Sequence, residues 1–117
     1  MGATVLIVDD HEVFRASARA LLESEGFVVV GEAATGAAAL EAVAAFRPEI
    51  VLLDIQLPDI DGLAVAESLA LASPAPAVVL ISSREAASYG PRLSEARARG
   101  FIAKSVLSGE AIASLVG

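Results

Sequence analysis

Residues 50–62 read IVLLDIQLPDIDG, and this stretch decides how the chain folds. Its first four residues form an unbroken apolar run, which predicts a strand buried on both faces, as the strands of parallel sheets are. Asp54 follows at the carboxyl end of that strand. Open parallel sheets bind their ligands at this edge, so we expect the Asp54 carboxylate to lie at the binding rim of an α/β sheet.

Three other predicted strands also end in polar side chains. The strands and the residues that follow them are 4–8 with Asp9 and Asp10, 77–81 with Ser82, and 101–103 with Lys104, the only lysine. Since parallel strands present their carboxyl ends at one edge, the three carboxylates, the hydroxyl and the ammonium are expected to meet there. Such a set suits a divalent metal, Mg²⁺ in particular, together with a phosphoryl group.

The strands alternate with helical patterns along the whole chain. The predicted helices are residues 12–25, 36–46, 62–72 and 109–116, and a further strand is predicted at residues 27–30. Five β-α units with short connections predict one α/β domain over residues 1–117, with a doubly wound five-stranded parallel sheet and helices on both faces. The last helix is short, about two turns against a mean of about 11–12 residues, which suggests that a further segment follows.

Gly90-Pro91 falls where the fourth helix is expected. Proline inside a helix costs about 3 kcal/mol or more, whereas proline in the first turn costs little. The sequence therefore predicts a short helix from Pro91 to about Ala98, preceded by a loop over residues 85–89. Leu93 and Ala96 are expected to anchor it, and it should carry a small basic face for an acidic partner or a second copy. The arginines of that face are Arg92, Arg97 and Arg99.

Composition excludes several classes of protein. The net charge of −7 argues against direct nucleic-acid binding, and the absence of cysteine excludes disulfides and thiolate metal sites. No apolar stretch approaches the ~20 residues of a membrane span, and no signal peptide is visible, so we expect a cytoplasmic protein that does not bind membranes. Arg15 and Arg19, four residues apart, are expected on a solvated helix face.

In the order Asp-Asp, Asp, Ser, Lys at the ends of the first, third, fourth and fifth predicted strands, the chain resembles the receiver domains of bacterial two-component response regulators. Residues 5–11, VLIVDDH, look like the family's opening strand and acidic pair, and residues 51–62 are similar to its phosphoacceptor segment. With residues 30–33, VGEA, the opening looks most like receivers that precede LuxR-type helix-turn-helix output domains. The resemblance covers essentially the whole chain.

The resemblance implies a fold and a set of roles. The fold is flavodoxin-like, with strand order 2-1-3-4-5. Asp54 would be phosphorylated by a partner histidine kinase, with Mg²⁺ bound directly by Asp10 and Asp54, through water by Asp9, and by the backbone carbonyl of Gln56. The domain would catalyse only phosphoryl transfer onto its own aspartate and slow autodephosphorylation.

The remaining roles concern the phosphorylated state. By resemblance, Ser82 and Lys104 would contact the phosphoryl group. Ser82 and Phe101 would be the switch residues, which couple the phosphoryl group to the outer face of the domain. The switch would change the face formed by the fourth helix, the fifth strand and the last helix, which could also form a homodimer. A DNA-binding output domain would follow the receiver. Gln56 and Arg84, each two residues past a site residue, are expected to lean over the phosphoryl group and set its lifetime.

The sequence departs from the family at two positions near the site. Ser105 stands where a proline is common, and Phe101 lacks the hydroxyl of the commoner tyrosine. His11 is interpreted as a helix-start residue, with a metal or catalytic role as the alternative. Two other functions stay open: a constitutive interaction module, and a magnesium phosphatase of the haloacid-dehalogenase type. Against the phosphatase, its motifs come in the reverse order to those of this chain, and 117 residues leave no room for a cap domain.

Overall fold

The computed structural model describes residues 2–116, which form a five-stranded parallel sheet in the order β2-β1-β3-β4-β5. The strands are β1 (Thr4–Val8), β2 (Val28–Ala33), β3 (Ile50–Asp54), β4 (Ala77–Ser82) and β5 (Gly100–Ala103). The predicted doubly wound fold and the strand order implied by the resemblance are both confirmed.

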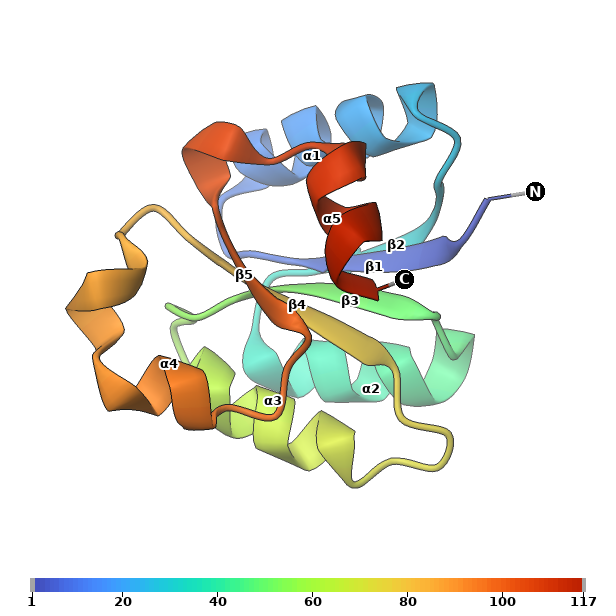
Figure 1. Ribbon diagram of the computed structural model, residues 1–117. Helices are drawn as coiled ribbons and strands as arrows, with labels where there is room; N and C mark the ends of the chain where they lie inside the picture. Colours follow the sequence, from blue (N-terminus) through green and yellow to red (C-terminus); the bar gives the residue numbers. More distant parts are fainter. Residues whose placement is uncertain (1, 117) are drawn as a thin grey trace.

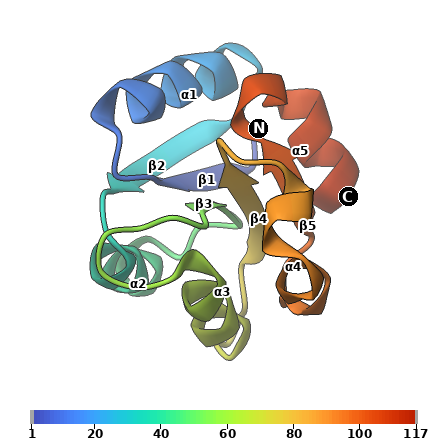
Figure 2. The ribbon, with the colours of Figure 1, turned by 90° about the vertical axis from the view of Figure 1, so that its left-hand side faces the viewer.

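Helices cover both faces of the sheet. They are α1 (Glu12–Ser24), α2 (Gly36–Phe46), α3 (Gly62–Ala70), α4 (Pro91–Glu95) and α5 (Gly109–Val116). Figures 1 and 2 show α1 and α5 on one face and α2, α3 and α4 on the other. None of the helices in the described part of the chain has the length and apolar character that a bilayer crossing requires.

The alternation of side chains along the strands builds two cores, one on each face of the sheet. On β1, Leu6 and Val8 pack with the side chains of α2 and α3, whereas Val5 and Ile7 pack with those of α1 and α5. All five residues of β3 are buried. Because both faces of β3 are covered, the carboxyl end of this strand is held firmly at the rim.

The second strand is longer than predicted. It runs from Val28 to Ala33, and its last three residues pair with residues 6–8 of β1 after a register shift between Val5 and Leu6. Gly31 lies under the ring of Phe46, where an added Cβ would come within 3.0 Å of a ring carbon. The glycine therefore serves close packing rather than a turn, and the strand continues through it.

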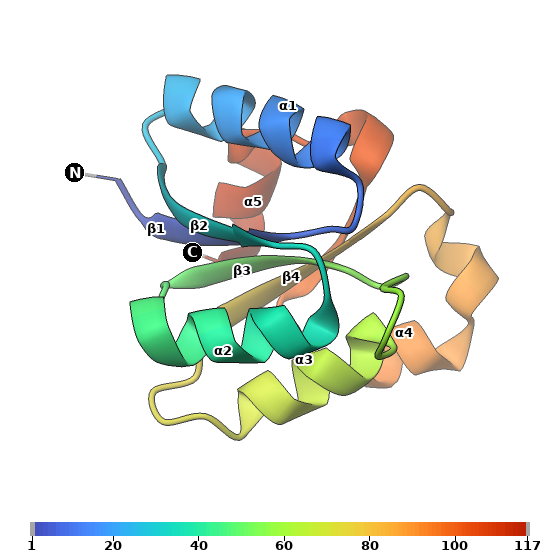
Figure 3. The ribbon, with the colours of Figure 1, turned by 180° about the vertical axis from the view of Figure 1, so that it is seen from behind.

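The segment after β4 matches the prediction at the proline and differs on both sides of it. Pro91 begins α4, as predicted, after Gly90 in a backbone conformation with φ 58°. The helix ends at Glu95, before the predicted Ala98, because Ala96 is extended. Residues 86–89 form a 3-10 turn, η1 (Ala86–Tyr89), rather than a loop. Figure 3 shows this segment beyond α3, at the edge of the molecule.

The predicted basic face on this segment is largely neutralised. Leu93 and Ala96 anchor the segment on the α2-α3 core, as predicted. Arg92, however, forms an ion pair with Asp61 at the start of α3, and Arg97 Nε lies 3.5 Å from Glu67 Oε2 of the same helix. Two of the three arginines thus have acidic partners within the domain, and whether this face binds an acidic partner or a second copy stays a prediction.

Candidate functional site

Four strand ends place the predicted side chains at one rim of the sheet. Asp54 is the last residue of β3 and Ser82 the last of β4, while Asp9 directly follows β1 and Lys104 follows β5. Asp9, Asp54 and Ser82 are buried although they are polar. Burying such groups is costly unless they are paired, so the rim must satisfy them internally or bind something that does.

Lys104 joins the two buried carboxylates. Its Nζ lies 2.5 Å from Asp9 Oδ2 and 3.1 Å from Asp54 Oδ2, and it sits 4.7 Å from the centre of the Phe14 ring. Burial by itself would lower the pKa of Lys104, but the carboxylates of Asp9 and Asp54 outweigh that effect and hold the pKa above its ordinary value. The side chain is therefore a charged ammonium at neutral pH.

Asp54 is a buried carboxylate with only part of its charge compensated. Burial raises the pKa of Asp54, and the nearby Asp9 carboxylate adds to the rise. The Gln56 N–H, which donates to Asp54 Oδ1 at 3.0 Å, and the Lys104 ammonium oppose the rise of this pKa. A desolvated carboxylate of raised basicity at a rim is suited to act as a nucleophile.

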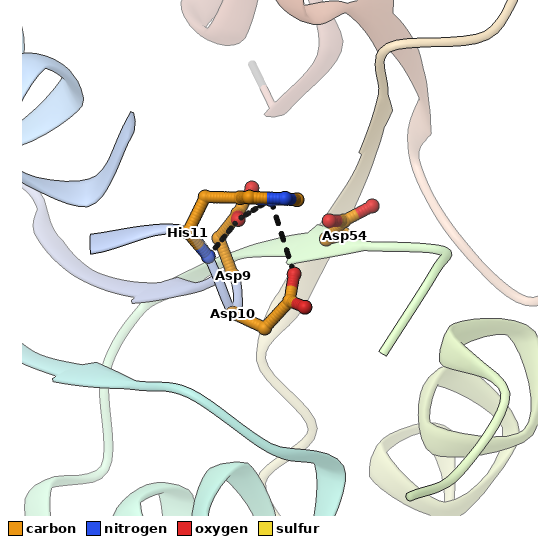
Figure 4. Close-up of side chains that lie close together, drawn as sticks. All are labelled: Asp9, Asp10, His11 and Asp54. Carbon is orange, nitrogen blue, oxygen red and sulfur yellow. Dashed lines mark hydrogen bonds and ion pairs between the residues drawn. The ribbon is translucent and has the colours of Figure 1, made fainter. Parts of the chain in front are cut away.

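The acidic pair and Asp54 form a cluster that could hold a cation. Asp9, Asp10, His11 and Asp54 each offer one ligand atom within 4.8 Å of the others (Figure 4). Among the described residues, the Lys104 ammonium at 2.5 Å is the one partner found for Asp9 Oδ2. Carboxylate oxygens in this number are the ligands that Mg²⁺ prefers. The donor set therefore fits a hard divalent ion.

The two adjacent aspartates differ in access. Asp9 is fully buried, and its Oδ1 accepts the His11 N–H at 2.8 Å. The Asp10 side chain is 35% exposed, and its Oδ1 lies 3.1 Å from His11 Nδ1. His11 is the N-cap residue of α1 but its side chain makes no capping bond. Asp10 is thus the more accessible carboxylate. His11 stands at the start of α1, as predicted, and its ring also contacts both carboxylates.

Ser82 has a partner that the sequence did not reveal. Its Oγ lies 2.5 Å from the hydroxyl of Tyr89 in η1 and accepts the Arg84 N–H at 3.0 Å. The Tyr89 ring in turn lies 6.3 Å from the ring of Phe101, centre to centre. A single tyrosine seven residues beyond Ser82 was the available signal, but only the 3-10 turn brings it back over the site.

The other predicted residues lie around this rim. Phe101 is half-buried and packs on the α2-α3 core. The Arg84 side chain is exposed, and the contact of this residue with the site is made by its backbone. Gln56 is also exposed, and its backbone lies beside Asp54. The peptide bond before Ser105 is not cis, since the one cis bond in the described residues is Ser73–Pro74.

Arg15 and Arg19 do not form the solvated face that was predicted. Arg15 Nε donates to Glu32 Oε1 at 3.0 Å, and its Nη1 donates to the backbone carbonyl of Asp9 at 2.6 Å. Arg19 Nε donates to Glu32 Oε2 at 2.7 Å. The hydrogen bond from Arg19 lowers the pKa of Glu32, although burial partly opposes this. The network was missed because Glu32 lies in the part of β2 that was not predicted.

One hollow in the surface lies away from this rim. It has a volume of about 500 Å³ and lies between the end of α2 and residues 72–76, before β4 begins. Its lining is mostly alanine, valine and proline, and it contains none of the rim residues. The polar chemistry of the molecule is therefore concentrated at the carboxyl ends of the strands.

Comparison with known proteins places the chain in one family. The model of the response regulator receiver domain matches residues 5–116. The chain is 41% identical over 100 residues to a Pseudomonas aeruginosa protein named as a transcriptional regulator, covering 86% of this chain and 48% of the relative. It is 36% identical over 100 residues to the virulence-factor transcription regulator BvgA of Bordetella pertussis, with the same coverage. The chain thus spans about half the length of these relatives.

Solved structures agree with the family match. The signal receiver domain of NarL from Mycobacterium tuberculosis superposes with a TM-score of 0.87 at 34% identity, covering 98% of this chain and 96% of that one. A LuxR-family two-component response regulator from Aurantimonas sp. SI85-9A1 gives a TM-score of 0.88 at 26% identity, covering 99% and 86%.

Proposed function

Because the chain belongs to the receiver domains of two-component response regulators, we propose that Asp54 accepts a phosphoryl group from a partner histidine kinase and that this step switches the domain. One observation carries the proposal: Lys104 joins the buried Asp9 and Asp54 carboxylates at the rim, with the Ser82 hydroxyl at the end of the neighbouring strand. Nucleophile, counter-charge and hydroxyl donor are thus assembled together.

The residues of this chain supply the groups that the transfer needs. A carboxylate oxygen of Asp54 attacks the phosphorus of a phosphohistidine, and the new P–O bond forms as the P–N bond breaks. The electron pair of the broken bond stays on the imidazole of the kinase. Lys104 turns its ammonium toward the phosphoryl oxygens, and Ser82 donates one hydrogen bond to them. Hydrolysis by water later returns the Asp54 carboxylate, with Gln56 and Arg84 limiting access of that water.

Asp10 and Asp54 are the residues proposed to hold Mg²⁺ directly, with Asp9 through water and Gln56 through its backbone carbonyl. A bound Mg²⁺ supplies positive charge that offsets the negative charge developing on the phosphoryl oxygens. The accessible carboxylate of Asp10, and the position of Asp9 and Asp10 in one cluster with Asp54, support this assignment. The chain's own part is to keep the carboxylates close together and mostly dry.

The switch is proposed to run through Ser82. When Ser82 turns to the phosphoryl group it must leave the Tyr89 hydroxyl, and Tyr89 packs on Phe101. Phosphorylation would therefore shift the population of conformations of η1, α4 and β5, and with it the α4-β5-α5 face. That face is where we place a homodimer of the activated domain.

The relatives support a proposal about the domain that follows the receiver. We propose that the receiver spans residues 1–117 and precedes a LuxR-type DNA-binding domain. This is supported by the similarity to EvgA of Escherichia coli, a DNA-binding transcriptional activator, which is 29% identical over 99 residues and matched over 48% of its length. The domain itself, with a net charge of −7, is not expected to contact DNA. We propose a cytoplasmic location, and no enzymatic turnover beyond the chain's own phosphoaspartate.

Incubation with acetyl phosphate, with and without Mg²⁺, tests the proposal. The intact mass should rise by one phosphoryl group only when Mg²⁺ is present, and beryllofluoride with Mg²⁺ should change the NMR spectrum at the rim. A chain that gains no mass and shows no spectral change under these conditions would instead be a constitutive interaction module.

Asp10→Asn should weaken Mg²⁺ binding more than Asp9→Asn does. Both substitutions keep side-chain size and remove one negative charge, but Asp10 is the accessible carboxylate and Asp9 is turned toward Lys104. The loss for Asp9→Asn should be about 10–100-fold, as for groups that orient metal ligands. Calorimetric titration with Mg²⁺ measures both variants, and equal losses would contradict the assignment.

Tyr89→Phe should speed phosphorylation by acetyl phosphate. The substitution removes the hydroxyl bonded to Ser82 and keeps the ring that packs on Phe101. One hydrogen bond contributes about 1 kcal/mol, which corresponds to roughly fivefold in rate if Ser82 must leave Tyr89 before transfer. Mass spectrometry over time measures the rate, and a slower Tyr89→Phe variant would show that the hydroxyl assists transfer.

A further inference from the structure

We propose that Arg15 is a positioning residue that holds the Asp9-Asp10 turn in the shape that binds Mg²⁺, an inference that rests on the proposed function. Arg15 is on α1, and among the described residues its side chain makes no hydrogen bond or ion pair with either carboxylate of the pair. It acts on the backbone between them, through the 2.6 Å hydrogen bond from its Nη1 to the Asp9 carbonyl.

The main chain of Asp9 is held from two sides. Its N–H donates to the Ala33 carbonyl at 3.0 Å, which continues the pairing of β1 with β2. Its carbonyl accepts from Arg15. With both ends of the residue fixed, the peptide that joins it to Asp10 has little freedom to rotate, and this limits the directions in which the Asp10 side chain can leave the backbone.

Glu32 makes this arrangement compatible with a nearby cation. The side chain of Arg15 is only 15% exposed, so its charge is poorly screened by water. A positive charge in this position would by itself repel Mg²⁺. Glu32 accepts the Nε hydrogen bond of Arg15 and so supplies a negative charge that offsets the charge of the guanidinium.

The geometry requires arginine rather than any cation. The guanidinium is planar and rigid, so Nε can donate to Glu32 while Nη1 donates to the Asp9 carbonyl. A lysine ammonium in the same place is a single point at the end of a flexible stem and could not join both acceptors in one fixed orientation. The inference thus concerns orientation and not charge alone.

Arg19 offers a matched control within the same network. It also donates to Glu32, at 2.7 Å, and comes from the next turn of the same helix. Its remaining contacts are with Glu23 and the Val29 carbonyl, and none of them reaches Asp9. Removal of Arg19 therefore disturbs the network with Glu32 but leaves the Asp9 carbonyl bond in place.

The experiment compares Mg²⁺ affinity by calorimetry in the wild-type chain, Arg15→Ala, Arg15→Lys and Arg19→Ala. Arg15→Ala should bind Mg²⁺ about 10-fold more weakly, as expected when a group that orients a ligand is lost. Arg15→Lys should recover only part of the affinity, and Arg19→Ala should bind as the wild type does. Thermal unfolding in EDTA, run in parallel, measures how much each substitution destabilises the fold.

A second measurement does not depend on metal. In EDTA, the amides of Asp10 and His11 should exchange with deuterium faster in Arg15→Ala than in Arg19→Ala or the wild type, because only the first variant frees the turn. If the wild-type chain bound no Mg²⁺, the proposed function would fail, while this exchange comparison would still decide whether Arg15 holds the turn.

Three results would overturn the inference. Arg15→Ala could match the wild type in both affinity and amide exchange. Arg15→Ala and Arg19→Ala could lose the same affinity for Mg²⁺, in proportion to the fall in their melting temperatures. The network with Glu32 would then only support the fold. Arg15→Ala could also bind Mg²⁺ more tightly, which would show that repulsion by the arginine outweighs any gain from its orientation of the turn.

Discussion

Asp54→Asn is expected to abolish phosphorylation and, at the same time, to stabilise the metal-free fold. The amide cannot act as the nucleophile, so acetyl phosphate with Mg²⁺ should add no mass to the variant. Burial raises the pKa of the Asp54 carboxyl, so its favourable contribution to folding is present below the unfolded pKa and is lost as the pH rises through the folded pKa. At neutral pH the buried charge is therefore a cost, which asparagine removes.

Asp59→Asn is the matched control for this prediction. Asp59 accepts the N–H groups of Gly36 and Ala37 at the start of α2, and these bonds lower its pKa. Its contribution to stability has the opposite sign, because it is present above the unfolded pKa and lost as the pH falls through the lowered folded pKa. Asp59→Asn should accept phosphate normally and be less stable at neutral pH in urea unfolding with EDTA. A phosphorylated Asp54→Asn chain would refute the assignment of the nucleophile.

Lys104→Met should produce the largest loss of stability at the rim. The side chain is 13% exposed and stands between carboxylates that are 0% and 3% exposed. Removing one partner of a buried ion pair leaves an uncompensated charge and costs about 3 kcal/mol. Here two carboxylates lose their cation together, whereas methionine fills a similar volume and keeps a contact with Phe14. Urea unfolding at neutral pH in EDTA should show the loss.

Mg²⁺ should return much of the stability lost in Lys104→Met. A divalent ion held by Asp10 and Asp54 would replace the missing positive charge, so the unfolding midpoint should rise more in Mg²⁺ for this variant than for the wild type. Lys104→Arg, which keeps the charge, serves as the control and should lose less in EDTA. An equal loss for Lys104→Met in EDTA and in Mg²⁺ would show that no metal enters between these carboxylates.

The residues at the strand ends could be predicted because local pattern and topology agree there. An apolar run fixes the strand, and the residue after it must lie at the rim of a parallel sheet, as Asp54, Ser82 and Lys104 do. The start of α4 was predictable for a similar reason. Proline restricts its own backbone and that of the preceding residue, so Pro91 marks a helix start without any knowledge of distant contacts.

Contacts between distant segments were beyond the sequence pattern. Gly31 and Glu32 lie beyond the predicted end of the second strand, yet pairing with β1 holds them in a strand, and this brings Glu32 to Arg15 and Arg19. The bond between Ser82 and Tyr89 depends on the 3-10 turn before Gly90, whose path is set by packing on the core. In both cases a long-range contact outweighs local preference.

The contact between Tyr89 and Ser82 also makes Tyr89 an intrinsic spectroscopic probe of the rim. The chain contains one tyrosine and no tryptophan, so nearly all of its near-ultraviolet absorbance and emission come from a single ring. That ring has its hydroxyl at 2.5 Å from Ser82 Oγ and its centre 6.3 Å from the centre of the Phe101 ring. Quenching, anisotropy and lifetime of this emission therefore report on the rim directly, and phosphorylation can be followed in real time without attaching a dye.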